Sequence, residues 1–144
     1  GDAGKGLAPQ NDLVIQTEVE ILRSDRLRRQ VIERLGYAKV FPKLADKFAA
    51  ATAAKQQDMI AKGVVALGTG LKVESAPATT VIHVAFQHPD AGMSALILNT
   101  LVQEYLVYRK QVLLEGLDDI AGTLKSDPAL ASFEGKMAES RPWL

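Results

Sequence analysis

Residues 79–114 read TTVIHVAFQHPDAGMSALILNTLVQEYLVYRKQVLL, and the pattern of this segment predicts a strand followed by a long helix. Residues 79–86 are rich in β-branched side chains and alternate with period two, which is typical of a strand. Pro89 and Asp90 then open a helix over 90–115, because proline fits the first helical position and an acidic side chain suits the positive end of the helix dipole. The helix is apolar around most of its circumference, so we expect it to be buried on several sides.

A second segment with strand alternation, LKVES at residues 71–75, lies just before this one in the chain. Ser75-Ala76-Pro77-Ala78 joins the two segments and is a turn candidate, so we expect a hairpin near residues 71–87. Two strands alone are marginally stable in water. Either helices cover the pair or a further strand completes the sheet.

Apolar residues at spacings of three and four predict two further helical regions, at 12–35 and 43–67. Ser24 is a candidate N-cap that divides the first region into two helices, and Gly36 is a candidate stop. The predicted fold class is therefore α+β, a small antiparallel or mixed sheet packed by helices. The predicted organisation is a flexible leader at 1–11, one α+β domain at 12–116 and a helical tail at 117–144 that restarts at Asp127-Pro128.

The composition excludes several classes of function. The 144 residues suit one domain, and 17 basic residues balance 17 acidic ones, which removes the electrostatic argument for nucleic acid. Aromatic residues make up only 6%, too few for a base-stacking surface. The absence of cysteine excludes disulfides, thiolate zinc sites and a thiol nucleophile.

No group of residues forms a recognisable catalytic or metal-binding motif. His83 and His88 are the only histidines, and their spacing on an extended segment directs them to opposite faces. No serine lies in a GxSxG elbow, and the adjacent pair Asp118-Asp119 would diverge by roughly 100° on a helix. We therefore predict no enzyme activity, no catalytic residues, no cofactor and no metal.

Two polar features allow alternatives. Asn99 lies within the apolar helix and is expected to find a hydrogen-bond partner either inside the fold or across a subunit contact. A cluster of arginines is either a solvated helix face paired with Glu20, Asp25 and Glu33, or a site for acidic glycan or phospholipid headgroups. Its candidate contact residues are Arg23, Arg26, Arg28 and Arg29.

Four segments together resemble the Wzz-type chain-length determinants, the polysaccharide co-polymerases that include exopolysaccharide transport proteins of the GumC kind. They are TEVEILRS at 17–24, VIERLG at 31–36, TVIHVAF at 80–86 and the helix from Pro89 to Tyr105. Each segment consists mostly of apolar positions. In this order and spacing they cover roughly residues 13–110.

The resemblance implies a non-enzymatic periplasmic domain of a bacterial inner-membrane protein that sets the chain length, or aids the export, of a surface polysaccharide such as lipopolysaccharide. It implies membrane attachment only through segments outside this sequence, with residues 117–144 as the stub of a longer arm. The implied partners are other copies of the chain, a polysaccharide polymerase, the growing glycan and a cytoplasmic tyrosine kinase. The candidate interface residues are Glu20, Leu22, Ser24, Leu96, Asn99, Glu104 and Tyr105.

Two rival functions remain open from the sequence. The apolar helix of 90–115 would suit a helical adaptor or scaffold that binds a partner protein. The arginine cluster would suit a small module that binds acidic glycan.

Overall fold

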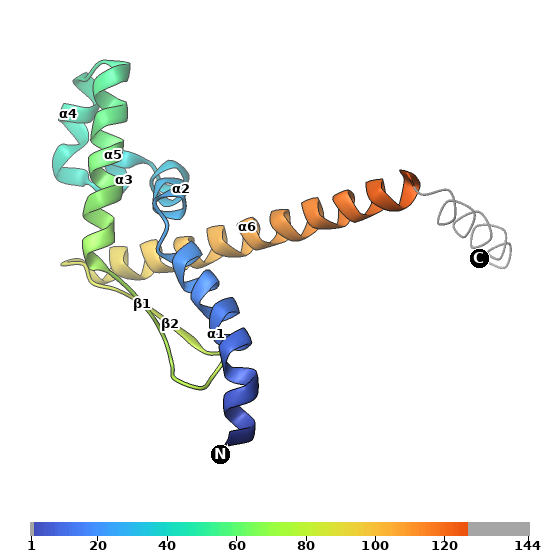
Figure 1. Ribbon diagram of the computed structural model, residues 1–144. Coiled ribbons are helices and arrows are strands. Elements are labelled where there is room, and N and C mark those ends of the chain that lie inside the picture. The colour runs from blue at the N-terminus through green and yellow to red at the C-terminus, as the bar shows by residue number, and fades with distance from the viewer. Residues whose placement is uncertain (1, 127–144) are drawn as a thin grey trace, which may run out of the picture. The chain divides into compact units, whose positions relative to one another are not determined.

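A computed structural model describes the backbone of residues 2–126 and the side chains of residues 12–125. These residues are mostly helical with one small sheet, which confirms the predicted α+β class (Figure 1). By its internal contacts the chain forms two compact units, Gly1–Leu106 (unit 1) and Val107–Leu144 (unit 2). In chain order the elements are α1 (Asp2–Leu22), α2 (Asp25–Leu35), α3 (Tyr37–Val40), the 3-10 helix η1 (Pro42–Leu44), α4 (Ala45–Ala50), α5 (Ala53–Gly70), β1 (Leu71–Ser75), β2 (Ile82–Phe86) and α6 (Ala91–Ser126).

Ser24 separates α1 from α2, as the sequence predicts. Its backbone is extended, at φ −67° and ψ 147°, and its hydroxyl oxygen accepts a hydrogen bond from the Leu27 amide at 3.4 Å. The same hydroxyl donates to the Ile21 carbonyl at 2.7 Å. One side chain therefore serves the last turn of α1 and the first turn of α2. Gly36 ends α2 at φ +91°, a conformation that favours glycine.

The helical region expected over 43–67 is divided into η1, α4 and α5. The break lies at Ala51, whose ψ of 153° is extended, and Thr52 follows as the N-cap of α5. The Thr52 hydroxyl oxygen accepts a hydrogen bond from the Lys55 amide at 3.2 Å. The Thr52 cap therefore marks the start of a new helix inside an alanine-rich segment whose apolar periodicity suggests one continuous helix.

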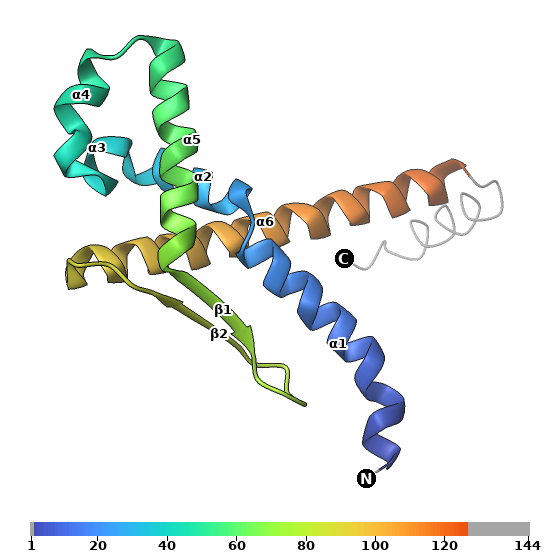
Figure 2. The same cartoon turned by 60° about the vertical axis from the view of Figure 1, so that its left-hand side comes forward.

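The hairpin predicted near 71–87 is present, with β1 and β2 antiparallel in the register Leu71↔Phe86 to Ser75↔Ile82. Both views show it beside α1 (Figures 1 and 2). One face of the sheet packs on α1, where Val19, Leu22 and Val73 form a buried cluster. Half-buried Ile82, Val84 and Tyr105 pack against the same cluster. Helices therefore cover one face of an otherwise marginal two-stranded sheet.

A second part of the core joins α2, α5 and the first turns of α6. Val31, Leu67 and Ile97 are almost fully buried and line one small void of about 10 Å³ that Phe86 also borders. A void of this size leaves almost no empty space between the side chains, so these elements are closely packed. The α2–α5 contact is visible in both views (Figures 1 and 2).

Helix α6 differs from the helix expected over 90–115. It begins at Ala91 and continues to Ser126 through Gly116, so one glycine inside a long helix does not end it. The Asp90 carboxylate accepts from the Met93 amide at 3.0 Å and caps the first turn. The expectation of burial on several sides is wrong beyond Tyr105, because most of the larger apolar residues from Leu106 to Ile120 are exposed.

Helix α1 begins at Asp2, and the chain divides into its two compact units after Leu106. The predicted organisation into a leader at 1–11, a domain at 12–116 and a tail at 117–144 stays a prediction. The helix start expected at Asp127-Pro128 lies outside the described residues. Over the part of the chain that is described, we find no helix long and apolar enough to cross a membrane.

Candidate functional site

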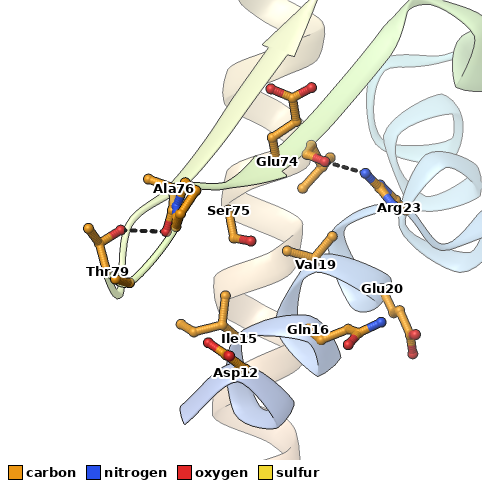
Figure 3. A pocket seen from close by; sticks show the side chains of 13 residues that line it. Asp12, Ile15, Gln16, Val19, Glu20, Arg23, Glu74, Ser75, Ala76 and Thr79 are labelled. Carbon is orange, nitrogen blue, oxygen red and sulfur yellow. Dashed lines mark hydrogen bonds between the residues drawn. The ribbon is translucent and has the colours of Figure 1, made fainter. Parts of the chain in front are cut away.

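An open groove of about 690 Å³ lies between α1 and the hairpin, and we call it the α1–hairpin groove (Figure 3). Its α1 side consists of residues spaced three or four apart, so they share one face of that helix. Its lining residues are Asp12, Ile15, Gln16, Val19, Glu20, Arg23, Val73, Glu74, Ser75, Ala76, Pro77, Ala78 and Thr79.

The groove has an apolar floor and a polar rim. Val19 and Val73 are buried at its base, with Ile15 packed against them. Glu20 and Glu74 are exposed at the rim (Figure 3). The turn end of the groove is held by the Thr79 hydroxyl, which donates to the Ala76 carbonyl at 2.9 Å. The burial of its floor therefore fixes the shape of the groove.

Three carboxylates and one guanidinium line the α1–hairpin groove. Asp12, Glu20 and Glu74 carry the negative charges, and Arg23 carries the positive one. The Arg23 guanidinium donates a short hydrogen bond to the Val73 carbonyl, so it joins α1 to β1 (Figure 3). The lining contains no histidine or cysteine, and within residues 12–125 no group of three or more His, Cys, Asp or Glu side chains could hold a metal ion.

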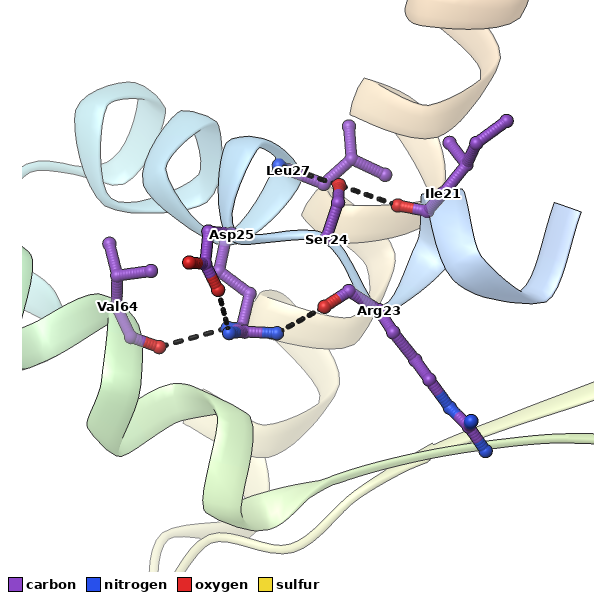
Figure 4. A network of polar contacts seen from close by, with 7 residues as sticks. Ile21, Arg23, Ser24, Asp25, Leu27 and Val64 are labelled. Atoms are coloured by element: carbon purple, nitrogen blue, oxygen red, sulfur yellow. Dashed lines mark hydrogen bonds and ion pairs between the residues drawn. The ribbon is translucent and has the colours of Figure 1, made fainter. Parts of the chain in front are cut away.

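A second polar network surrounds Arg28 at the start of α2 (Figure 4). Its Nε donates to the Val64 carbonyl of α5 at 2.9 Å, and its other nitrogens make short bonds to the Arg23 carbonyl and the Asp25 carboxylate. The Arg28 side chain is only 13% exposed. These bonds connect the α1–α2 junction to α5, so the guanidinium of Arg28 already has partners within the fold.

The candidate glycan-contact arginines lie in different environments. Arg23 bonds to β1 and Arg28 to α5, whereas Arg26 is exposed and Arg29 is half-buried. Arg23 and Arg28 therefore make contacts between elements. Their role toward an acidic ligand stays an untested prediction.

The candidate interface residues are also distributed over several environments. Leu22 and Glu104 are buried, Ser24 caps α2, and Glu20 and Asn99 are exposed. Asn99 is therefore exposed on α6, and its expected hydrogen-bond partner stays a prediction. The remaining two, Leu96 and Tyr105, are half-buried, and their role in an interface stays a prediction.

Sequence reasoning missed two long-range polar contacts of α6. The Arg34 Nε donates to the Glu104 Oε1 at 2.8 Å, and the Tyr105 hydroxyl donates a short hydrogen bond to the Glu18 carboxylate. Both glutamates are buried. The available signal was a carboxylate on an otherwise apolar helix face, because a charge buried there requires a partner.

Among the residues whose side chains are described, the pKa values of Asp58 and Tyr37 are shifted, and neither residue lines the groove. Hydrogen bonding and charge from Lys62, with a smaller contribution from Lys55, lower the pKa of Asp58 on α5. Burial raises the pKa of Tyr37 on α3. Both shifts have local structural causes.

Unit 2 carries a row of exposed apolar side chains on α6. Leu113, Leu117 and Ile120 follow the spacing of one helix face and are 64%, 53% and 58% exposed. We call these three residues the α6 stripe. Large apolar side chains that gather on one exposed face are characteristic of surfaces that bind another protein.

Curated relatives match short stretches of this chain. A 3-isopropylmalate dehydratase small subunit from Jannaschia sp. is 41% identical over 56 residues, which are 39% of this chain and 24% of the relative. The protein of that name from Mesorhizobium japonicum is 50% identical over 55 residues, which are 38% of this chain and 24% of the relative. The one from Psychromonas ingrahamii is 51% identical over 37 residues, which are 26% of this chain and 18% of the relative. The matched stretch thus spans a quarter or less of each of these relatives.

No family model matches the chain, and no solved structure matches it. The named relatives nevertheless contradict the resemblance to Wzz-type chain-length determinants. The motifs behind that resemblance are mostly apolar positions, such as Ile97 and Leu101, which are buried here. Any packed helix needs such positions, so they carry little information about family.

The functional expectations based on that resemblance are corrected with it. The relatives are named as subunits of a dehydratase, so the expected non-enzymatic regulator of polysaccharide length or export is wrong. The expected polymerase, glycan, tyrosine kinase and self-assembly partners are contradicted in the same way, because the relatives are named as small subunits of a dehydratase. The expected periplasmic, inner-membrane location has no remaining support.

Proposed function

We propose that this chain carries part of a small subunit of a dehydratase that acts on 3-isopropylmalate, and that it works by binding the enzyme's other, larger subunit. The observation that carries the proposal is the 41–51% identity, over 37–56 residues, to proteins named 3-isopropylmalate dehydratase small subunit. Three organisms supply these relatives, so the proposal does not depend on a single protein.

The α6 stripe supports a role in subunit association. Leu113, Leu117 and Ile120 are more than half exposed, although burying a leucine or isoleucine side chain gains about 1.5–3 kcal/mol. A partner that covers these side chains would recover this free energy. Subunit interfaces concentrate their binding energy in a few such apolar side chains.

Co-purification with a large subunit tests the proposal. The full chain, carrying an affinity tag, is co-expressed with the large subunit of the Mesorhizobium japonicum enzyme, and the amount of untagged large subunit retained is measured. We expect retention in a stoichiometric complex. Leu117→Asp places a charge in the stripe, and we expect it to weaken retention by about tenfold or more.

Val65→Asp is the matched control, because Val65 is 66% exposed on α5, outside the stripe. It introduces the same charge on another helix, so we expect retention close to that of the unaltered chain. Equal losses in Leu117→Asp and Val65→Asp would contradict a role for the stripe. Absence of any complex with the unaltered chain would contradict the proposed function itself.

A further inference from the structure

In the hairpin, every second residue of each strand bonds to the other strand. The N–H and C=O groups of the residues between them face away from the other strand. The Gln87 amide donates to the Gly70 carbonyl at 2.9 Å, and the Ala76 amide donates to the Val81 carbonyl at 3.1 Å. Since hydrogen-bonded pairs alternate along an antiparallel ladder, Ala85 and His83 of β2 bond to β1. The N–H and C=O groups of Ile82, Val84 and Phe86 therefore face outward.

Two side-chain hydrogen bonds agree with this assignment of the outward groups. They cover part of the outer edge of β1 and part of the outer edge of β2. On β1, the Arg23 guanidinium binds the outward carbonyl of Val73. On β2, the Ser94 hydroxyl donates to the outward carbonyl of Phe86 at 2.6 Å. The outward groups of Ile82 and Val84 are left without a partner among residues 12–125. We call them the open β2 edge.

The open β2 edge lacks the features that usually protect a free strand. Strand β2 reads IHVAF and contains no lysine, acidic residue or proline. Its five pairs with β1 run in unbroken register, so no bulge twists the edge away. Exposed strands without such protection readily accept another strand.

We propose that the open β2 edge binds an extended, uncharged segment of the larger subunit, which adds a third strand to the sheet. This inference rests on the proposed function for the identity of the partner. Ile82 and Val84 each present one outward N–H and one outward C=O group. Such pairs of a donor and an acceptor bind a polypeptide backbone. Strand addition thus supplies an anchor in unit 1, independent of the α6 stripe in unit 2.

The two faces of the sheet define the chemistry of the added segment. On the covered face, Ile82 and Val84 are half-buried beside the Val19–Leu22–Val73 cluster, so the segment presents apolar side chains there. On the open face, Lys72 and Glu74 pair with each other at 3.5 Å. Their charges compensate one another, so a neutral polar side chain fits this face. Apolar and polar residues therefore alternate in the segment.

Amide hydrogen exchange of the full chain, alone and in complex with the large subunit, tests the inference. We expect exchange at the Ile82 and Val84 amides to slow by about tenfold or more in the complex. Val84→Pro removes the outward donor, and proline is tolerated on an edge where its nitrogen faces solvent. We expect this variant to bind the large subunit about tenfold more weakly.

Ala85→Thr is the matched control, because it changes an exposed side chain on the same strand and keeps every outward backbone group. It should bind like the unaltered chain. A complex that forms without slower exchange at Val84 overturns this inference and leaves the proposed function intact, whereas absence of a complex overturns both. Slower exchange that depends only on the concentration of the chain itself would assign the edge to a second copy and overturn the inference. If Val84→Pro fails to fold, the exchange rates of the unaltered chain decide.

Discussion

The Arg34 Nε on α2 lies 2.8 Å from the Glu104 Oε1 on α6, and this ion pair joins residues 70 positions apart in the chain. The Glu104 side chain is 8% exposed and the Arg34 side chain 65% exposed, so the arginine reaches in from solvent to a buried carboxylate. With the Tyr105–Glu18 hydrogen bond one residue later, α6 is attached to both α1 and α2 within unit 1.

Removing Arg34 should destabilise unit 1. Arg34→Ala leaves the Glu104 carboxylate buried without its cation, and solvent around the exposed arginine reduces the cost, so we expect a loss of about 1–2 kcal/mol in the free energy of unfolding. Urea denaturation measures it. Lys39→Ala removes a charge of the same sign from an exposed position on α3 and should change the stability by less than about 0.5 kcal/mol. Equal losses in the two variants would show that net charge, rather than the ion pair, is responsible.

Loss of the Ser24 hydroxyl should weaken the α1–α2 junction. Ser24→Ala removes the cap of the Leu27 amide and the bond to the Ile21 carbonyl, and we expect a cost of about 1 kcal/mol. Ser24→Asp keeps an acceptor for the amide and should recover most of that stability. Thermal denaturation followed by circular dichroism compares the two. Equal destabilisation by both substitutions would mean that the cap contributes nothing.

Two glycines on helices should respond oppositely to alanine. A Cβ on Gly63 would lie 2.7 Å from Phe41 Cε2 and 3.3 Å from Ile32 Cδ1, so we expect Gly63→Ala to destabilise by about 1–2 kcal/mol. Nothing lies within 4 Å of a Cβ on Gly116, and alanine is the better helix former, so Gly116→Ala should strengthen α6 by about 0.5–1 kcal/mol. Chemical denaturation of each variant gives the sign. A stabilising Gly63→Ala would contradict the close packing of α5 on Phe41.

The lysines flanking Asp58 should control its titration. Because Lys62 lowers the pKa of this carboxyl, its stabilising effect is complete above its ordinary value of 3.8 and is lost as the pH falls through the lower folded-state pKa. Lys62→Ala should therefore raise the pKa of Asp58 toward 3.8. NMR titration of the carboxyl carbon measures this directly. An unchanged pKa in Lys62→Ala would assign the shift to another cause.

Local features of the fold could be predicted from the sequence. Ser24 is a cap followed by a helical stripe, Gly36 provides the positive φ, and residues 71–75 and 82–86 alternate as strands do. Each signal acts within a few residues. The break at Ala51 escaped prediction because alanine suits a helix and only the capping hydroxyl of Thr52 marks the new start.

Long-range features could not be predicted in the same way. The partners of Glu104 and Glu18 lie 70 and 87 positions away, and only tertiary packing brings them together. The periodicity of α6 likewise does not say where burial ends. Ile97 is buried and Leu113 is exposed although both belong to the same apolar helix. The α1–hairpin groove depends on how α1 lies on β1, which no local pattern specifies.

Isothermal titration of the full chain into a large subunit of 3-isopropylmalate dehydratase measures the proposed subunit association itself. We predict one-to-one binding with a Kd of about 10 μM or tighter, weakened in Leu117→Asp and unchanged in Val65→Asp. An absence of binding at about 100 μM of both proteins, with the chain folded by circular dichroism, would contradict the claim that this chain is part of a dehydratase small subunit.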